Sequence, residues 1–176
     1  DIKYLNDLCL DIVPLENGEG SPAPSQSPSP SPEVSPSTVH AAGMPDKSWY
    51  IGHENDDVYT INTADQLAGL AELVNSGNDF AGKTIVLEAD IDLSNYGKNF
   101  NDGKGWIPIG RNFSVGYQSN GSIFSGTFDG NGHKITGLYI NDPLTSYASY
   151  SSTTALFGVV SGGTIRNLGI ADANIT

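Results

Sequence analysis

The sequence predicts an all-β fold, the start of a right-handed parallel β-helix whose first turn is capped by one α-helix. Three features support this prediction. The chain has one amphipathic helical segment, a series of short apolar runs separated by glycine and asparagine, and an apolar pattern that recurs thirty residues apart, at 135 and 165. A repeat of this length is typical of a solenoid, because one turn can bury its apolar face only against its neighbour.

The helical segment has signals for both of its ends. Thr63 can accept a hydrogen bond from the first turn, and Gln66, three residues later, completes the pattern of a capping box. Gly77 can adopt the left-handed conformation that ends a helix. We therefore expect a helix over residues 64–76. Its apolar stripe consists of Leu67, Leu70, Ala71 and Val74.

Short strands are expected in the rest of the chain. Residues 83–93 carry apolar side chains at alternate positions, as does a strand that buries one face. The pattern I-x-x-L-x-I occurs twice and places three residues of one copy over three of the other. The two sets are Ile135, Leu138, Ile140 and Ile165, Leu168, Ile170. No hairpin turn separates matched runs, and residues 95–105, 111–122 and 141–154 are predicted to be loops.

Composition divides the chain into three parts. Residues 1–18 are predicted to contain the last strand of a preceding module; without that module they would pair elsewhere or stay disordered. Residues 19–45 are predicted to be a disordered linker, because Ser and Pro fill twelve of the sixteen positions in 21–36. This segment suits a semi-rigid polyproline II spacer, and the alternative is a ligand for a proline-binding domain. Residues 46–176 are predicted to be the capped first portion of a truncated β-helix domain.

Charge and cysteine content exclude several classes of partner. The formal charge is −12, and no cluster of basic residues offers contacts to phosphates, so neither nucleic acid nor an anionic membrane is expected to bind. Membrane insertion is not predicted, because no apolar run approaches the roughly 20 residues of a transmembrane helix. Cys9 is the only cysteine, which excludes an intrachain disulfide and a cysteine-based zinc cluster. The chain starts without a signal peptide, so we expect a removed leader or an internal piece of a longer protein.

Four segments occur in a characteristic order, at residues 106–110, 124–140, 155–158 and 163–176. With these segments, the chain from about residue 58 onward resembles the GLUG-motif repeats of bacterial surface proteins. The resemblance implies a parallel β-helix on large exported proteins such as adhesins, with no shared active site. It implies a structural role alone for Trp106, Gly110, Phe128, Asp129, Gly130, Asn131, Gly132 and Asn167.

No catalytic set is recognisable. Parallel β-helices also host polysaccharide lyases and hydrolases, and glycoside hydrolysis needs two carboxylates across the sugar. Asp129 has no acidic counterpart in the next repeat, where residues 161–163 are Ser-Gly-Gly. His40, His53 and His133 form no His-Glu-x-x-His motif. We therefore predict that the chain is not an enzyme, and a fragment of a polysaccharide-degrading enzyme is the least favoured interpretation.

Candidate binding residues are few. No cofactor or metal is predicted, although Asp90, Asp92 and Asp102 offer oxygen ligands for Ca²⁺; ordinary solvated carboxylates are the favoured alternative. Exposed tyrosines can stack on sugars or anchor a protein partner. Three tyrosines lie in polar loops where no core requires them: Tyr117, Tyr147 and Tyr150.

The sequence therefore predicts a non-catalytic module at the bacterial cell surface or in the extracellular space, used for adhesion or for carbohydrate or protein interaction. The expected partners are a glycan or a surface protein, together with neighbouring domains of the same polypeptide. The alternative function is a structural stalk that holds another domain away from the cell wall.

Overall fold

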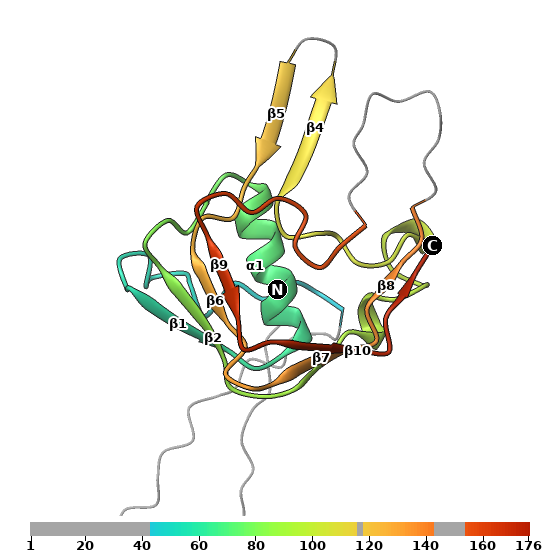
Figure 1. Cartoon of the computed structure of the whole chain (residues 1–176), viewed down its shortest axis with the longest axis horizontal. Helices are drawn as coiled ribbons and strands as arrows, with labels where there is room; N and C mark the ends of the chain where they lie inside the picture. Colours follow the sequence, from blue (N-terminus) through green and yellow to red (C-terminus); the bar gives the residue numbers. More distant parts are fainter. Residues whose placement is uncertain (1–42, 116–117, 143–153) are drawn as a thin grey trace, which may run out of the picture. The chain divides into compact units, whose positions relative to one another are not determined.

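The computed structural model describes residues 43–115, 118–142 and 154–176, and between residues 112 and 120 it describes the backbone alone. This part consists mainly of short strands in parallel sheets, together with one α-helix, α1 (Ala64–Asn75) (Figure 1). The predicted strand in residues 1–18 and the predicted linker, except for residues 43–45, lie outside the described residues.

Helix α1 begins where the sequence predicts. The Thr63 hydroxyl accepts a hydrogen bond from the backbone N–H of Gln66 at 3.2 Å. The Gln66 side chain accepts from the N–H of Asn62 at 2.8 Å, one residue earlier than in the usual capping box. Asp65 places an acidic side chain in the first turn, where the helix dipole favours it. The sequence therefore determines this helix start almost completely.

The end of α1 is a Schellman motif. Gly77 has a φ of 105°, and its N–H donates to the carbonyl of Val74 at 2.9 Å. The N–H of Asn78 donates to the carbonyl of Leu73 at 3.1 Å, which satisfies a second carbonyl of the last turn. The predicted apolar stripe is buried, with two small residues added to it. The buried residues are Leu67, Ala68, Gly69, Leu70, Ala71 and Val74.

The strands form three parallel sheets and one antiparallel hairpin. The strand order is β1-β2-β6-β9 in the first sheet, β3-β7-β10 in the second and β8-β11 in the third, and the hairpin is β4-β5. The strands are β1 (Val58–Ile61), β2 (Thr84–Leu87), β3 (Ile91–Asp92), β4 (Arg111–Val115), β5 (Gln118–Ser122), β6 (Thr127–Asp129), β7 (Lys134–Thr136), β8 (Tyr139–Ile140), β9 (Thr164–Arg166), β10 (Gly169–Ala171) and β11 (Asn174–Ile175).

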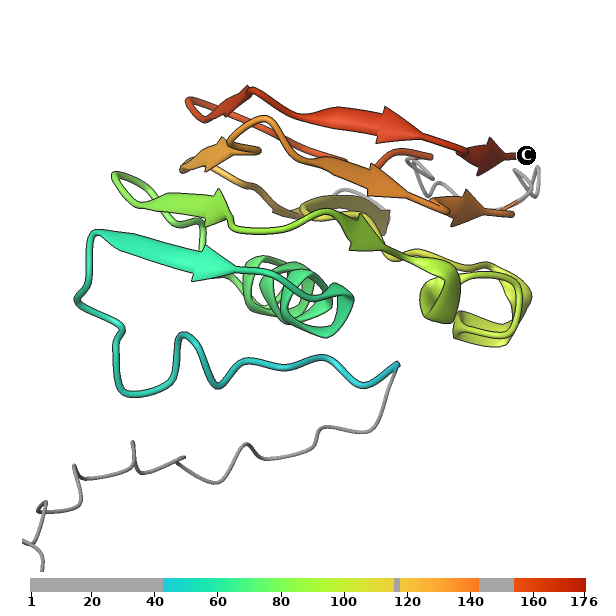
Figure 2. The same cartoon turned by 90° about the horizontal axis from the view of Figure 1, so that it is seen from below.

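Strands that follow one another along the chain lie in rows, and the rows stack on one another (Figure 2). We call β9, β10 and β11 the last row. Apolar residues of successive rows face each other in register, and those before the last row belong to one continuous core. The register pairs are Ile85 with Phe128, Phe128 with Ile165, Ile91 with Ile135, Ile135 with Ile170, and Ile140 with Ile175.

The alignment of the two I-x-x-L-x-I motifs predicted from the sequence is wrong by one strand. Ile135 pairs with Ile170 rather than with Ile165, and Ile165 pairs with Phe128. Because isoleucine recurs at every fifth position of residues 165–175, the pattern fits more than one register equally well. The backbone pairing of β6 with β9 decides between these registers.

The strand predicted over residues 83–93 is also wrong in its length. The structure has two strands there, β2 and β3, which belong to different sheets. Ile85, Leu87, Ile91 and Leu93 are all buried, so the alternation continues through the turn between the strands. The alternation of apolar residues alone therefore does not reveal the turn at which the chain passes from the sheet of β2 to the sheet of β3.

The loop predicted over residues 111–122 is instead the hairpin of β4 and β5, which contradicts the expectation that hairpins are absent. Five residue pairs join its strands in antiparallel register, from Arg111 opposite Ser122 to Val115 opposite Gln118. Figure 1 shows this hairpin extending away from the parallel sheets. Its backbone groups pair without an alternating apolar pattern, so a search for apolar runs misses it. Residues 95–105 contain two short 3₁₀-helices, η1 (Ser94–Tyr96) and η2 (Asn101–Gly103).

One end of the stack is covered by residues 43–57, which run beneath β1 and α1 (Figure 2). The N–H of Asp46 donates to the carbonyl of Asp65 at 2.8 Å, and the Trp49 indole N–H donates to the carbonyl of Asp46 at 2.9 Å. A cluster of aromatic rings closes this end, with centroids 5.4–6.2 Å apart. The rings belong to Trp49, Tyr50, Tyr59 and Phe80.

Candidate functional site

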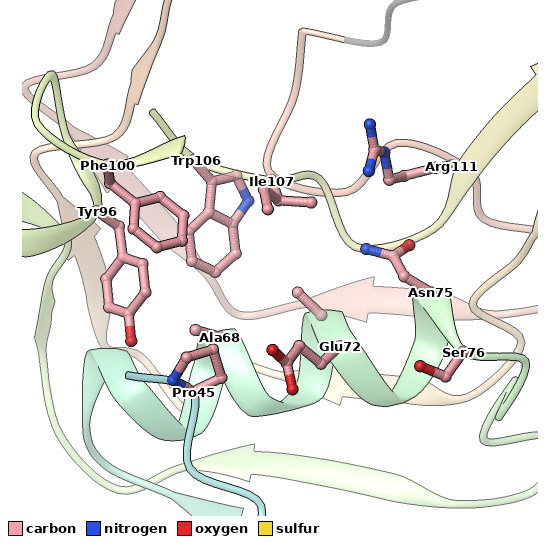
Figure 3. A pocket seen from close by; sticks show the side chains of 11 residues that line it. Pro45, Ala68, Glu72, Asn75, Ser76, Tyr96, Phe100, Trp106, Ile107 and Arg111 are labelled. Carbon is pink, nitrogen blue, oxygen red and sulfur yellow. The ribbon is translucent and has the colours of Figure 1, made fainter. Parts of the chain in front are cut away.

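A cavity of about 410 Å³ lies between helix α1 and the chain that leads into β4. Figure 3 shows aromatic rings gathered on one side of this cavity and polar side chains of α1 on the other. The aromatic wall is formed by Tyr96, Phe100 and Trp106. The cavity has the volume of an ordinary small-ligand site, which is roughly 300–1,000 Å³. It is therefore our candidate binding site.

Edge-to-face packing holds the aromatic wall in place. The ring centroid of Tyr96 lies 4.8 Å from that of Phe100 and 5.9 Å from that of Trp106, with the planes 68° and 78° apart. The Trp106 indole N–H donates to the carbonyl of Leu156 at 3.2 Å, which ties the wall to the chain before the last row. Tyr96 and Trp106 are buried, whereas Phe100 is partly exposed and offers its ring to a ligand.

A partly buried hydrogen bond joins this wall to α1. The Tyr96 hydroxyl donates to the Asp65 carboxylate at 2.6 Å, and the same carboxylate oxygen accepts from the N–H of Gly43 at 3.0 Å. Burial raises the pKa of Tyr96 well above its usual value, and the hydrogen bond to the Asp65 carboxylate raises it further. The phenol therefore stays neutral and serves as a hydrogen-bond donor that positions η1 against the helix.

The polar side of the cavity combines an amide with a carboxylate. The Asn75 amide donates to the carbonyl of Pro108 at 3.0 Å and accepts from the Ser122 hydroxyl at 3.0 Å, so its position is determined. The Glu72 carboxylate lies 2.9 Å from the Lys47 ammonium, and its side chain is 48% exposed. Arg111 lines the same cavity. These groups can accept and donate hydrogen bonds to a ligand that packs on Phe100.

Trp106 is the one residue with an implied structural role that lines the cavity, and Asp129 is at the centre of a group of the others. Its carboxylate accepts hydrogen bonds from Arg166 at 2.9 Å, from Asn167 at 3.0 Å and from the N–H of Asn131 at 2.9 Å. The hydrogen bond from Asn167 is the largest cause that lowers the pKa of Asp129. A Cβ on Gly130 would lie 2.5 Å from the carbonyl oxygen of Asn167. Together these contacts join β6 to the last row.

The lowered pKa of Asp129 predicts a pH dependence. A carboxylate whose pKa is lower in the folded state stabilises the fold above its ordinary pKa, and this contribution is lost as the pH falls through the folded-state pKa. Asp129→Asn is therefore expected to lower the melting temperature at about pH 5, and this deficit is expected to disappear towards about pH 2. Thermal melts across this range test it, with exposed Glu88→Gln as the control. If the melting temperature of Asp129→Asn were lower by the same amount at every pH, the Asp129 carboxylate would not have a lowered pKa in the folded state.

The remaining predicted structural residues are placed as follows. Phe128 is completely buried between neighbouring rows, and Trp106 is 2% exposed. A Cβ on Gly110 would lie 2.5 Å from the carbonyl oxygen of Val159, and Gly132 follows Asn131 in the turn before β7. Tyr117, Tyr147 and Tyr150, the candidate binding tyrosines, lie outside the residues whose side chains the structure describes.

The acidic residues considered for calcium do not converge on one point. Asp90 accepts hydrogen bonds from the N–H of Lys134 at 3.1 Å and lies 3.2 Å from His133. Asp92 instead accepts from the N–H of Ser94 at 2.9 Å, and Asp102 belongs to η2. Across residues 43–115, 118–142 and 154–176, no three His, Cys, Asp or Glu side chains gather as a metal site. In the same ranges, no helix has the length and apolar character needed to cross a membrane.

Sequence reasoning missed the cavity. Tyr96 and Phe100 lie in a segment that the sequence assigns to a loop, and Glu72 and Asn75 are ordinary polar positions of an amphipathic helix. One signal was present: three aromatic residues occur at positions 96, 100 and 106 within an otherwise polar, glycine-rich stretch. A solvated loop does not need three large rings.

Two known proteins are similar to this chain. A Gly-rich membrane protein of Evansella cellulosilytica is 34% identical over 140 residues, which cover 78% of this chain and 14% of that protein. Halomucin of Haloquadratum walsbyi is 36% identical over 90 residues, which cover 51% of this chain and 1% of that protein. The chain thus matches a small part of each relative. No protein-family model matches the chain, and no solved structure matches it.

Proposed function

We propose that this chain is a non-catalytic module exposed at a cell surface or in the extracellular space, where it binds a glycan or a surface protein. The cavity beside α1 carries the proposal, because it combines a partly exposed ring, Phe100, with the hydrogen-bonding groups of Glu72 and Asn75. Sugars and protein side chains are both recognised by this combination of stacking and hydrogen bonds.

The proposed architecture is the capped beginning of a right-handed parallel β-helix of the GLUG-motif type. Its support is the parallel register that runs through three sheets, together with the single helix at the covered end. Such a scaffold suits a surface protein, because stacked rows extend a rigid body and leave the connecting loops free for recognition.

The names of the two relatives support the proposed location. One is called a membrane protein and the other halomucin, and each is far longer than the segment it shares with this chain. A surface-associated location suits both names. The acidic composition is consistent with an exported, soluble surface, since excess charge of one sign keeps proteins apart.

The proposal that the chain is not an enzyme has one geometric support. Among the residues that line the cavity, Glu72 is the only carboxylate, and it is paired with Lys47. Glycoside hydrolysis in its two common forms uses a pair of carboxylates that flank the scissile bond. The cavity therefore suits binding better than polysaccharide cleavage.

Binding to arrays of immobilised glycans and extracellular matrix proteins tests the proposal. We expect the unmodified chain to bind a restricted set of ligands, and Phe100→Ala combined with Glu72→Gln to weaken that binding by at least about tenfold. Ile51→Ala, which changes a 63% exposed residue away from the cavity, serves as the matched control. Alanine at Tyr117, Tyr147 and Tyr150 tests the loops separately.

The outcomes separate adhesion from the alternative. If the cavity variant and the control bind equally well while the triple tyrosine variant does not, the loops are the binding surface and the cavity is not. If the unmodified chain binds nothing on either array, the adhesion proposal fails and the structural stalk becomes the better explanation. The Ser/Pro-rich segment at 21–36 favours that alternative, because polyproline II segments act as spacers.

A further inference from the structure

A second, smaller hollow adjoins the cavity beside α1. It shares three lining residues with the cavity, namely Trp106, Ile107 and Arg111. Figure 3 shows Ile107 and Arg111 across the cavity from Glu72 of α1. Because the same side chains line both spaces, the cavity and the hollow meet along residues 106–111, and one ligand can occupy both.

The hollow is too small to hold a ligand of its own. Its volume is about 80 Å³, which is well below the roughly 300–1,000 Å³ of a small-ligand site. It therefore suits a substituent of a few atoms, carried by a ligand whose larger part lies in the cavity.

The charged groups of the hollow favour an anionic substituent. Lys104, Arg111 and Asp142 line it, so two cations stand against one carboxylate. The Lys104 ammonium lies 3.2 Å from the Asp142 carboxylate, and the Lys104 side chain is 54% exposed, so it can also contact a ligand. The Arg111 guanidinium has five N–H donors in a planar fork that matches the two oxygens of a carboxylate. A carboxylate is therefore the substituent that fits best.

The hollow belongs to a cationic stretch of an otherwise acidic chain. Residues 93–128 have a net charge of +2, from Lys98, Lys104, Arg111 and Asp102, whereas the whole chain has a formal charge of −12. The remaining residues repel a densely charged polyanion at long range, and the two cations of the hollow attract a single carboxylate at short range. The charge pattern therefore favours a ligand with one isolated carboxylate.

The cavity favours hydroxyl groups next to that carboxylate. The ionised Glu72 carboxylate can only accept hydrogen bonds, and its side chain is 48% exposed, so it can accept from the ligand as well as from Lys47. Phe100 is partly exposed and offers its ring to an apolar face. A sugar ring has both hydroxyl donors and an apolar face, whereas an acidic protein side chain has no hydroxyl beside its carboxylate. A carboxylated sugar therefore matches the two spaces together.

We propose that the ligand of this module is a glycan that carries an isolated carboxylated sugar, such as a terminal uronic acid. The sugar ring packs against Phe100 in the cavity, its hydroxyl groups donate to Glu72, and its carboxylate lies in the hollow between Lys104 and Arg111. This inference rests on the proposed function and narrows its ligand from a glycan or a surface protein to one class of glycan.

Matched pairs of glycans test the role of the charge. Oligosaccharides that end in glucuronic or galacturonic acid are compared with their methyl esters, which keep the shape of the sugar and remove its charge. We expect isothermal titration calorimetry to show affinities for the acids that are at least about tenfold above those for the esters, because charge-assisted hydrogen bonds from a guanidinium and an ammonium are lost in the ester.

Two substitutions in the hollow are expected to change the affinity for the acids in opposite directions. Lys104→Gln should weaken it by about 2–5-fold, as the loss of an exposed ion pair does. Asp142→Asn should strengthen it by a similar factor, because the carboxylate that competes for the Lys104 ammonium is removed. Affinities for the esters should stay unchanged in both variants. Lys98→Gln is the matched control, since it removes a cation from the same stretch but lines neither space.

Several results would overturn this inference. Equal affinities for acids and esters, or no binding of the acids, would mean that no carboxylate enters the hollow. An acid-to-ester ratio that changes in neither Lys104→Gln nor Asp142→Asn would place the carboxylate elsewhere. If neutral glycans or matrix proteins nevertheless bind in a manner that depends on Phe100 and Glu72, the proposed function stands and this inference alone fails. If nothing binds on either array, the proposed function fails, and the inference fails with it.

Discussion

Replacing Phe128 with alanine is expected to lower the free energy of unfolding by about 3–5 kcal/mol, the largest loss among the substitutions considered. Phe128 is completely buried and stands in the middle of the longest sheet, between Ile85 and Ile165. Its ring centroid is 5.0 Å from that of Phe157, with an edge-to-face angle of 69°. Truncation removes the contacts of the ring with Ile85, Ile165 and Phe157. The backbones of β2 and β9 are paired with β6, and this pairing restricts how far the neighbours can move into the space that the ring leaves.

Equilibrium denaturation by urea measures this loss. Ile51→Ala is the matched control, because Ile51 is 63% exposed and its truncation is expected to change stability by no more than about 0.5 kcal/mol. If Phe128→Ala cost as little as the control, the side chain would not lie in the core, and the register of β6 against its neighbours would be wrong.

Gly69→Ala is expected to destabilise the protein by about 1–3 kcal/mol, although the same change in an isolated helix stabilises it by roughly 0.5–1 kcal/mol. Gly69 lies in the interior of α1, where a Cβ would be 2.0 Å from the carbonyl oxygen of Asp46 and 2.7 Å from its carbonyl carbon. Both obstructing atoms are backbone atoms, so the segment of residues 43–57 must move away. The carbonyl of Asp46 also accepts the indole N–H of Trp49, which links this clash to the aromatic cluster.

A double-mutant cycle with Trp49→Ala shows whether the covering segment is what moves. If Gly69→Ala displaces this segment, Trp49→Ala lowers the free energy of unfolding by less in the Gly69→Ala background than in the natural sequence. Urea denaturation of the four proteins provides the comparison. A rise in stability for Gly69→Ala, as helix propensity alone would produce, would mean that residues 43–57 do not pack on α1.

The covering of the first end and the exposure of the last row have a common consequence for stability. Apolar residues in the middle rows contact a neighbouring row on both sides, as Phe128 does. The isoleucines of the last row contact a neighbouring row on one side within the described part of the chain. Substitutions in the last row are therefore expected to cost less than equivalent substitutions in β6 or β7.

The sequence by itself determined the elements whose causes are local. Thr63, Gln66 and Gly77 specify both ends of α1, because capping depends on groups within a few residues of each other. The burial of Ile85, Leu87, Ile91 and Leu93 was equally visible, since it follows from the period of an extended chain. The acidic composition and the single cysteine are likewise properties of the sequence alone, and the classes of partner that they argue against stay predictions.

The tertiary structure alone decided the register, the corners and the candidate site. Ile135 could face Ile165 or Ile170 equally well in the sequence, because a regular spacing of isoleucines fits several registers and only pairing across the sheet selects one. The cavity brings Phe100 to Glu72 and Asn75, which lie more than twenty residues away, and no local pattern encodes that approach. Contacts between residues distant in the chain depend on how the rows stack. The packing of the whole core decides that stacking, and no short stretch of sequence specifies it.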